Sequence, residues 1–371
     1  MEERLEAAGG ELLAAVANGV ATVTLNRPAA HNALTLGMIL GLAAWMEAWA
    51  GDERVKLVVF RGAGGKAFCA GGDVRALYEG WKAGHRDQLE FFTPEYALNY
   101  RIHTYPKPIV AVMDGIIMGG GMGLAQGAAL RIATDKTRMG MPETAIGLFP
   151  DVGGTWFLSK CPGKIGTYLG LVGPTIRAAD ALYARLADAY LAPDAMTRLD
   201  AELEAAAATA DPRAAVESLA QRLTSAPPGP ATLEPIRPAI DAHFGHVELR
   251  RVTASLQASV PPGPADWTAK ALEALAKHSP TMLAVTLEQL VRGPSLCLAE
   301  VFRMELGMVA TALEHGDFME GVRALLVAKD NNPRWNPPTI SDIDPAVVAR
   351  FFAPRWTADQ HPLRKLGSAT F

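Results

Sequence analysis

The sequence has few cysteines, little net charge and no long apolar run. Its three cysteines, Cys69, Cys161 and Cys297, are odd in number and far apart, without a C-x-x-C pair. They fit a reducing compartment and exclude a zinc knuckle. No uninterrupted apolar stretch reaches membrane-spanning length. The first residues, MEERLEAAGGELLAAV, lack the positive start and continuous apolar core of a secretory signal. These absences predict a cytoplasmic protein without a membrane partner.

The charge is balanced, with 35 Lys and Arg residues against 39 Asp and Glu residues and a formal net charge of −4. This balance argues against nucleic acid or an anionic membrane as the main partner. The histidines show no metal-ligand spacing, so we expect no metal site. With 371 residues, 49% of them hydrophobic, the chain can bury a large core and form one large domain or two smaller ones.

The first half of the chain alternates short apolar runs with helical patterns. A hairpin is expected from Leu12 to Leu25, because Asn18-Gly19 separates two runs rich in apolar and β-branched residues. Further strands are expected at Leu57–Phe60, Ile109–Met113 and Leu130–Thr134, and helices at Leu34–Ala50, Gln88–Tyr105, 121–128, Ile165–Leu171 and Ala178–Leu191. This alternation predicts an α/β core.

The second half has a different character. From residue 195 to about 330 it is alanine-rich and helical in pattern, and we expect no strand there. We therefore place a boundary between an α/β domain that carries the active site, residues 1–195, and a helical region, residues 196–371.

Two glycine-rich loops each connect a strand with a helix start. One is RGAGGKAFCAGGDV, residues 61–74, and the other contains Gly119, Gly120, Gly121 and Gly123. Without side chains, such loops let a ligand oxygen reach backbone N–H groups. Two readings compete with this one. Either loop can be a tight turn only, and Gly121, Gly123 and Gly127 approach a dinucleotide-binding fingerprint without matching its strict spacing.

Two carboxylates flank an apolar run on a turn-rich segment. Glu143 follows Pro142 and precedes Ala145–Phe149, and Asp151 follows Pro150. Carboxyl groups in apolar surroundings have raised pKa values and serve as acid, base or nucleophile. The alternatives are structural, because Glu143 suits the first turn of a helix and Asp151 suits a cap for a helix near Gly153.

Two other acids taken singly have ordinary interpretations. Asp73 suits an N-cap, and Glu95 suits a solvated or capping position. The combination of glycine loops with the acids Glu143 and Asp151 is more informative. Loops that hold developing negative charge, next to a carboxylate that handles water or protons, are typical of acyl chemistry.

Several of these segments resemble the crotonase (enoyl-CoA hydratase/isomerase) superfamily, in its 3-hydroxyisobutyryl-CoA hydrolase branch. The superfamily-level segments are LNRPAAHNAL (25–34) and KAFCAGGDV (66–74). The similarity extends to FFTPEYALN (91–99), MGGGMGL (118–124), MPETAIGLFPDVGGTWFL (141–158) and GDFMEGVRALLVAKDNNPRWNPP (316–338), and the last two carry patterns specific to the hydrolase branch. Residues 200–275 and the tail match loosely.

The resemblance implies a crotonase-like spiral of ββα units followed by an all-helical C-terminal region. It also implies an acyl-CoA thioester substrate and hydrolysis of 3-hydroxyisobutyryl-CoA in valine catabolism. By motif matching, the N–H groups of Gly72 and Gly120 form an oxyanion hole, Glu143 and Asp151 are the catalytic acids that also contact substrate, and Glu95 lines the substrate pocket.

The CoA portion of the substrate is assigned on weaker matches. Ala70 and Asp73 lie in the loop that holds its adenine end, and Lys329 is placed near a CoA phosphate. No separate cofactor is implied, because coenzyme A is part of the substrate. The superfamily commonly forms trimers, so a homo-oligomer is a further expectation, although the helical C-terminal half can cover the same surface.

One departure separates this chain from the hydratases that it resembles. They carry a glutamate where this chain has Gly123 and a glycine where it has Asp151. Hydrolysis by Glu143 and Asp151 is therefore the favoured reading, with hydration or a non-catalytic CoA-binding protein as alternatives. Two routes stay open, since Glu143 can attack the thioester to form an anhydride or can activate water.

Overall fold

The computed structural model describes residues 2–258 and 265–368, and the chain forms two compact units built from interleaved segments. Unit 1 comprises Met1–Gly72, Leu98–Gly140 and Thr175–Thr232, and unit 2 comprises Asp73–Ala97, Met141–Pro174 and Leu233–Phe371. The single boundary expected after residue 195 does not separate these units, because each takes segments from both sides of it.

Unit 1 contains a seven-stranded sheet in the order β1-β2-β3-β4-β6-β8-β10. Its strands are β1 (Glu3–Ala7), β2 (Leu12–Ala17), β3 (Val20–Leu25), β4 (Leu57–Gly62), β6 (Ile109–Met113), β8 (Leu130–Ala133) and β10 (Ala189–Tyr190). The predicted hairpin is confirmed as the antiparallel pair β2 and β3, whereas the pairings from β3 to β10 are parallel. Strand β1, which the sequence analysis did not predict, pairs antiparallel with β2.

A second, three-stranded parallel sheet contains β5 (Ala67–Cys69), β7 (Ile116–Met118) and β9 (Arg138–Gly140) in that order. Each of its strands follows a strand of the larger sheet and precedes a helical segment. The helical segments are α2 (Val74–Lys82), α4 (Gly120–Gln126) and the 3₁₀ helix Glu143–Ile146. The ββα alternation that the resemblance implies is therefore repeated along the chain.

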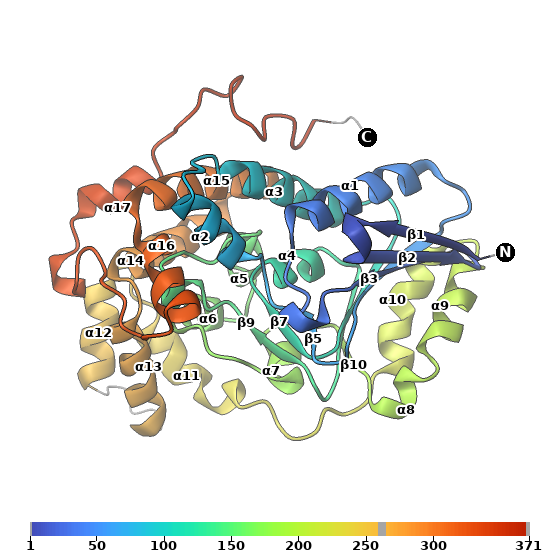
Figure 1. Ribbon diagram of the computed structural model, residues 1–371. Coiled ribbons are helices and arrows are strands. Elements are labelled where there is room, and N and C mark those ends of the chain that lie inside the picture. The colour runs from blue at the N-terminus through green and yellow to red at the C-terminus, as the bar shows by residue number, and fades with distance from the viewer. Residues whose placement is uncertain (1, 259–264, 369–371) are drawn as a thin grey trace. The chain divides into compact units, whose positions relative to one another are not determined.

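The large sheet of unit 1 is covered by helices. Helix α1 (Leu36–Gly51) begins at its N-cap Thr35 and lies against β1 and β2 (Figure 1). Helices α8 (Pro193–Met196), α9 (Leu199–Ala207) and α10 (Pro212–Leu223) pack through apolar side chains against strand residues such as Val59 and Val112. This shared core buries residues of β3, β4, β6, β8 and β10.

The helix expected over Ala178–Leu191 is confirmed in its first part, Ala178–Tyr183, and is wrong in the rest. The helix α7 ends at Tyr183 (Ala178–Tyr183), and Ala189–Tyr190 form β10, which pairs in parallel with β8. Both residues of β10 are buried. Their alanine-rich context carries a helical composition, but pairing with the end of the sheet determines their conformation.

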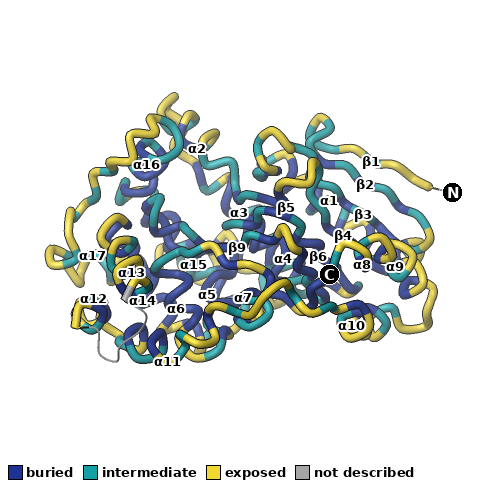
Figure 2. The backbone as a smooth tube through the Cα atoms, turned by 90° about the horizontal axis from the view of Figure 1, so that it is seen from below, coloured by how far each residue is buried: buried dark blue, intermediate teal, exposed yellow. Residues whose placement is uncertain are grey.

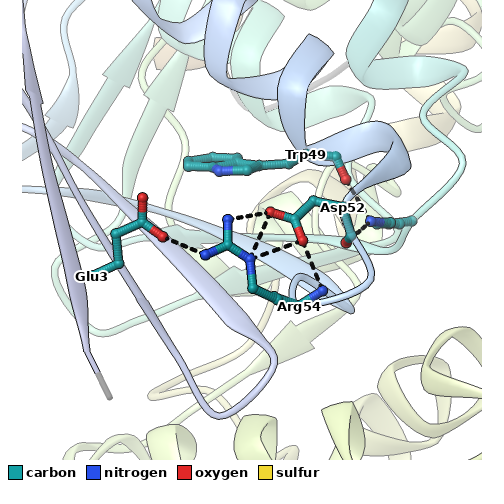
Figure 3. A network of polar contacts seen from close by, with 5 residues as sticks. Glu3, Trp49, Asp52 and Arg54 are labelled. Carbon is teal, nitrogen blue, oxygen red and sulfur yellow. Dashed lines mark hydrogen bonds and ion pairs between the residues drawn. The ribbon is translucent and has the colours of Figure 1, made fainter.

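Arg54 links the edge strand of unit 1 to the connection between α1 and β4. Figure 3 shows its guanidinium between Asp52, the C-cap residue of α1, and Glu3 on β1. The closest contacts are 2.7 Å to Asp52 and 3.0 Å to Glu3. The bidentate contact lowers the pKa of Asp52 to about 2, although the exposure of Arg54 limits what this network adds to stability.

Unit 2 is helical in the residues that the structure describes. Its helices beyond α2 are α5 (Gly154–Leu158), α6 (Ile165–Val172), α11 (Leu233–His243), α12 (Leu249–Ala258), α13 (Ala265–Lys277), α14 (Pro280–Arg292), α15 (Leu298–His315), α16 (Asp317–Val322) and α17 (Pro345–Phe351). Helix α3 (Leu89–His103), predicted from residue 88, contributes residues to both units. None of the helices described is long and apolar enough to cross a membrane.

Helix α4, which begins at the candidate residue Gly120, is buried. Figure 2 shows α4 in the colour of buried residues, and every residue from Gly120 to Gln126 is buried. By contrast, most of the edge strand β1 is exposed. The glycine loop that was expected to bind a ligand is thus part of the interior of unit 1.

Candidate active site

The two glycine loops lie side by side within unit 1. A methyl group on Gly71 would be 3.6 Å from the backbone nitrogen of Gly120 and 3.4 Å from the Met118 carbonyl oxygen. Gly72 forms a bridge with Leu34, and Gly120 is the first residue of α4. Because the first N–H groups of a helix have no partner within it, this position can donate to an oxyanion. The predicted pair Gly72 and Gly120 is therefore brought together by adjacent loops.

The dinucleotide alternative loses its support in the structure. A side chain on Gly121 would lie 2.3 Å from the Cys69 carbonyl oxygen, and one on Gly127 would lie 2.7 Å from the His103 nitrogen. These residues are glycines because neighbouring backbone occupies the Cβ position. Glu143 follows β9 rather than the strand after α4, so it does not hold the place of a ribose-binding acid.

Glu143 is buried within unit 2, where it opens the 3₁₀ helix Glu143–Ile146. Gly147 ends this helix in the left-handed conformation, with φ 74°, and its Cβ position is 2.2 Å from the Asp317 carbonyl oxygen. Likewise, a side chain on Gly321 would be 2.3 Å from the Ile146 carbonyl oxygen. The backbone of α16 therefore lies directly against the turn and fixes Glu143. Glu143 lies in the first turn of a helix, as the structural alternative predicted. A first-turn acid does not need to be buried, however, and Glu143 is buried.

Asp151 lies in the tight turn before α5. Val152 and Gly153, which follow it, have φ values of 52° and 87°. The Asp151 carboxylate accepts a 2.6 Å hydrogen bond from the Tyr96 hydroxyl, and both side chains are buried. The capping alternative for Asp151 is not what the structure shows, because α5 has no side-chain cap from this residue.

Glu305 of α15 satisfies the N-terminal region of α5 instead. Its carboxylate accepts from the backbone nitrogens of Gly153, at 2.8 Å, and Thr155, at 3.0 Å, and from the Thr155 hydroxyl. The Gln289 amide adds hydrogen bonds of 2.6 Å to the Pro150 carbonyl oxygen and to the Thr155 hydroxyl. The turn that carries Asp151 is consequently held from both of its ends.

Glu95 of α3 is buried, with 2% of its surface exposed, so the expectation of a solvated or capping residue is wrong. The apolar neighbours in FFTPEYALN include Phe92, whose ring packs edge-on against Phe318 and Tyr96. Glu95 Oε1 and Glu143 Oε2 have no hydrogen-bond partner among the residues that the structure describes. Unpartnered buried carboxylate oxygens are costly, and they mark places where a ligand can donate.

Four buried carboxyl groups of unit 2 have raised pKa values, and the charge of Asp151 contributes to the shifts of the other three. Burial, and next the charge of Asp151, raise the pKa values of Glu95 and Glu143 well above their usual range. Burial raises the pKa of Asp151 to about 6, against the hydrogen bond from Tyr96. Burial also raises the pKa of Glu305 to about 8, despite its donors. Carboxyls shifted in this way can exchange protons near neutral pH, as acid–base catalysis requires.

The residues assigned to coenzyme A are divided between the two units. Ala70 belongs to unit 1 and its N–H donates to the His31 carbonyl at 3.0 Å. Asp73 belongs to unit 2 and caps α2 by accepting from the Ala76 nitrogen at 3.2 Å, which confirms the predicted N-cap. Lys329 lies in unit 2, is exposed and has a φ of 55°. Their roles in CoA binding stay predictions.

Tyr96, Glu305 and Gln289 were missed by the sequence analysis. Tyr96 follows Glu95 directly in the segment FFTPEYALN, so the assignment of Glu95 to the substrate pocket could have pointed to Tyr96 as well. Glu305 interrupts the buried apolar face of α15 between Phe302 and Val309, and a carboxylate at such a position is also a usable signal. Gln289, buried on α14, has no comparable signal in the sequence.

Comparison with known proteins identifies relatives along almost the whole chain. The model of the enoyl-CoA hydratase/isomerase family matches residues 20–352. A Xenopus tropicalis protein named "3-hydroxyisobutyryl-CoA hydrolase, mitochondrial" is 38% identical over 352 residues, which cover 94% of this chain and 90% of that protein. A Neurospora crassa protein named as a small ribosomal subunit protein is 38% identical over 348 residues, covering 88% of this chain and 68% of that protein.

A solved structure titled as an enoyl-CoA hydratase from Rhodobacter sphaeroides has a TM-score of 0.84 and 38% identity. The match covers 93% of this chain and 98% of the other. It confirms the predicted fold class, an α/β spiral followed by helices.

The predicted cytoplasmic location is wrong, because the related hydrolases of Xenopus tropicalis, Danio rerio and Gallus gallus are named as mitochondrial. The prediction depended on three isolated cysteines and on the lack of a secretory pattern. Those features fit any reducing compartment and do not select the cytoplasm.

Proposed function

Because the chain belongs to the enoyl-CoA hydratase/isomerase family, we propose that it is an acyl-CoA thioester hydrolase that cleaves 3-hydroxyisobutyryl-CoA to 3-hydroxyisobutyrate and CoA. The names of its curated relatives support this activity. The observation in the structure that carries it is the buried pair Glu143 and Asp151 in unit 2. Their raised pKa values give them the proton affinity that water activation or nucleophilic attack requires.

Backbone N–H groups and carboxyl groups have different roles in the proposed reaction. In the proposed reaction, the N–H groups of Gly72 and Gly120 stabilise the negative charge on the thioester oxygen as the carbonyl carbon becomes tetrahedral. Glu143 either attacks this carbon, which expels the CoA thiolate and leaves a mixed anhydride for water to cleave, or removes a proton from the attacking water. The ionised Asp151 carboxylate accepts the proton that the attacking water loses, either directly or through Glu143, and the thiolate takes up a proton from Asp151 or from solvent to become the thiol. Both routes consume one water and yield one acid and one CoA.

The activity itself is tested by following thiol release. On addition of 3-hydroxyisobutyryl-CoA to the purified full chain, we expect stoichiometric formation of free CoA, detected with a thiol reagent. Crotonyl-CoA, incubated in parallel, should keep its enoyl absorbance. The reason is that this chain has Gly123 where the hydratases that it resembles carry one of their two catalytic glutamates. Loss of enoyl absorbance without thiol release would assign the chain to hydration instead.

A binding protein without turnover is the second candidate, and the name of the Neurospora crassa relative favours it. The raised pKa values of the buried acids Glu143 and Asp151 argue against it. Carboxyl groups shifted in this way suit proton transfer or nucleophilic attack, which binding alone does not use.

Glu95 is proposed to accept a hydrogen bond from the 3-hydroxyl group of the substrate. Replacing Glu95 with leucine keeps the bulk of the side chain and removes both oxygens. We expect kcat/KM for 3-hydroxyisobutyryl-CoA to fall by about tenfold to a hundredfold, the cost of one buried hydrogen bond, whereas isobutyryl-CoA, which lacks the hydroxyl, should be cleaved as before. The readout is the ratio of the two kcat/KM values.

The control is Glu90→Gln, which changes an exposed glutamate of the same helix. It should leave the ratio unchanged. An equal loss of kcat/KM for both substrates in Glu95→Leu would show that Glu95 supports the fold of the pocket and does not read the hydroxyl group.

A further inference from the structure

Tyr96 is the buried residue that makes direct contact with an acid of the proposed site. Its hydroxyl donates to Asp151 Oδ2 at 2.6 Å, and none of the residue is exposed. Its ring packs against Phe92 and Phe302, with centroid separations of 6.0 Å and 6.1 Å. These ring contacts fix the direction of the hydroxyl, so the donor stays in place without help from Asp151.

The backbone that carries Asp151 has its own supports. Gln289 binds the Pro150 carbonyl oxygen, and Glu305 binds the nitrogens of Gly153 and Thr155. The Tyr96 hydroxyl is therefore not needed to hold this turn. What it can control is the orientation and protonation of the Asp151 carboxylate.

Resting on the proposed function, we propose that Tyr96 is a positioning residue for catalysis: its hydroxyl binds one oxygen of Asp151 and leaves the other available for the reaction. Burial and the neighbouring carboxylates raise the pKa of the Tyr96 phenol well above its usual value, so this hydroxyl stays protonated and only donates to Asp151. A donor of this kind favours the ionised carboxylate over the neutral acid.

The titratable groups around Asp151 decide how this effect is measured. Glu95 shares α3 with Tyr96, Glu143 lies on the neighbouring turn, and Glu305 approaches from α15; each interacts with Asp151. Burial opposes the ionisation of Asp151, and the negative charge of Asp151 in turn raises the pKa values of these three carboxyl groups. The Tyr96 hydroxyl is the side-chain donor that acts in the opposite direction, so its loss should move the acidic limb of the kcat profile to higher pH.

The test is Tyr96→Phe, which keeps the ring and removes the hydroxyl. We expect kcat to fall about tenfold, as for loss of a hydrogen bond to a charged group, with KM nearly unchanged and the acidic limb displaced to higher pH. Adding Tyr96→Phe to Asp151→Asn should cost much less than adding it to the parent, because the partner carboxylate is gone.

The matched control is Tyr105→Phe, which removes another buried tyrosine hydroxyl, bound at 2.6 Å to the Met46 carbonyl oxygen in unit 1. This variant should lose stability but keep the acidic limb of the parent. If Tyr96→Phe does not fold, 3-fluorotyrosine at position 96 retains a hydroxyl of greater acidity and should move the limb to lower pH.

Two results would overturn the role of Tyr96, provided that the parent is active. One is a folded Tyr96→Phe variant whose acidic limb lies at the same pH as that of the parent. The other is a double variant in which the losses of kcat from Tyr96→Phe and Asp151→Asn are additive. A parent that releases no thiol would overturn the proposed function itself, so the two failures are distinguishable.

Discussion

Glu143→Gln is expected to lower kcat for 3-hydroxyisobutyryl-CoA by roughly 10³–10⁴-fold, the range seen when an acid–base or nucleophilic group is removed. The amide keeps the size of the side chain but can neither attack the thioester carbon nor accept a proton from water. Because the residue is buried against α16, the neutral side chain should fit without loss of fold. KM should change little, so binding and chemistry separate.

The measurement is single-turnover thiol release, with Glu234→Gln on α11 as the control for an exposed glutamate of the same unit. Running the parent in oxygen-18 water separates the two routes. Attack of water on the Glu143 carbonyl of an anhydride leaves the first heavy oxygen on Glu143, whereas direct attack places it in the released acid. Cleavage by Glu143→Gln at the parent rate would disprove both routes.

Asp151→Asn is expected to lower kcat by about 10²–10³-fold, less than Glu143→Gln because solvent can partly replace a proton donor or acceptor. The amide can still accept from the Tyr96 hydroxyl, so the turn should keep its geometry. In the parent, the pKa of Asp151, raised by burial to about 6, should appear as an acidic limb: kcat falls as the pH decreases below about 6 and the carboxylate is protonated.

In Asp151→Asn this limb should disappear from the profile. The exposed Asp87, changed to asparagine, is the control. A variant that keeps both the parent rate and the limb would reduce Asp151 to a residue of the turn before α5, and the limb would then belong to Glu143 or Glu95.

Much of the fold was predictable from local patterns. The hairpin at Asn18-Gly19, the buried strand Ile109–Met113 and the helix of residues 89–103 each carry their signal within a few residues. Strand β1 was not predictable in this way, because its sequence ERLEA is charged and exposed and takes its conformation from pairing with β2. The two residues of β10 are likewise defined by β8, which lies far earlier in the chain.

The candidate site follows the same division. Gly72, Gly120, Glu143 and Asp151 could be selected from the sequence because glycines after strands and acids in apolar turns are local features. The contacts of Asp151 with Tyr96 and of its turn with Glu305 join positions 55 and about 150 residues apart. No local pattern encodes such pairs, although the apolar stripe of α15 shows that Glu305 needs a buried partner.

The interleaving of the two units has a consequence for how the chain acquires its structure. Unit 2 takes residues 73–97 from early in the chain and most of its mass from residues 233–371. During synthesis, the segment that carries Glu95 and Tyr96 therefore emerges long before Phe302 and Phe318, the rings against which this segment packs. Contacts of such high sequence separation form late and slow folding. A fragment that stops at residue 195 would contain the proposed catalytic acids but none of the helices α14 to α16 that hold them, so no single cut near the middle of the chain yields a unit that carries them intact.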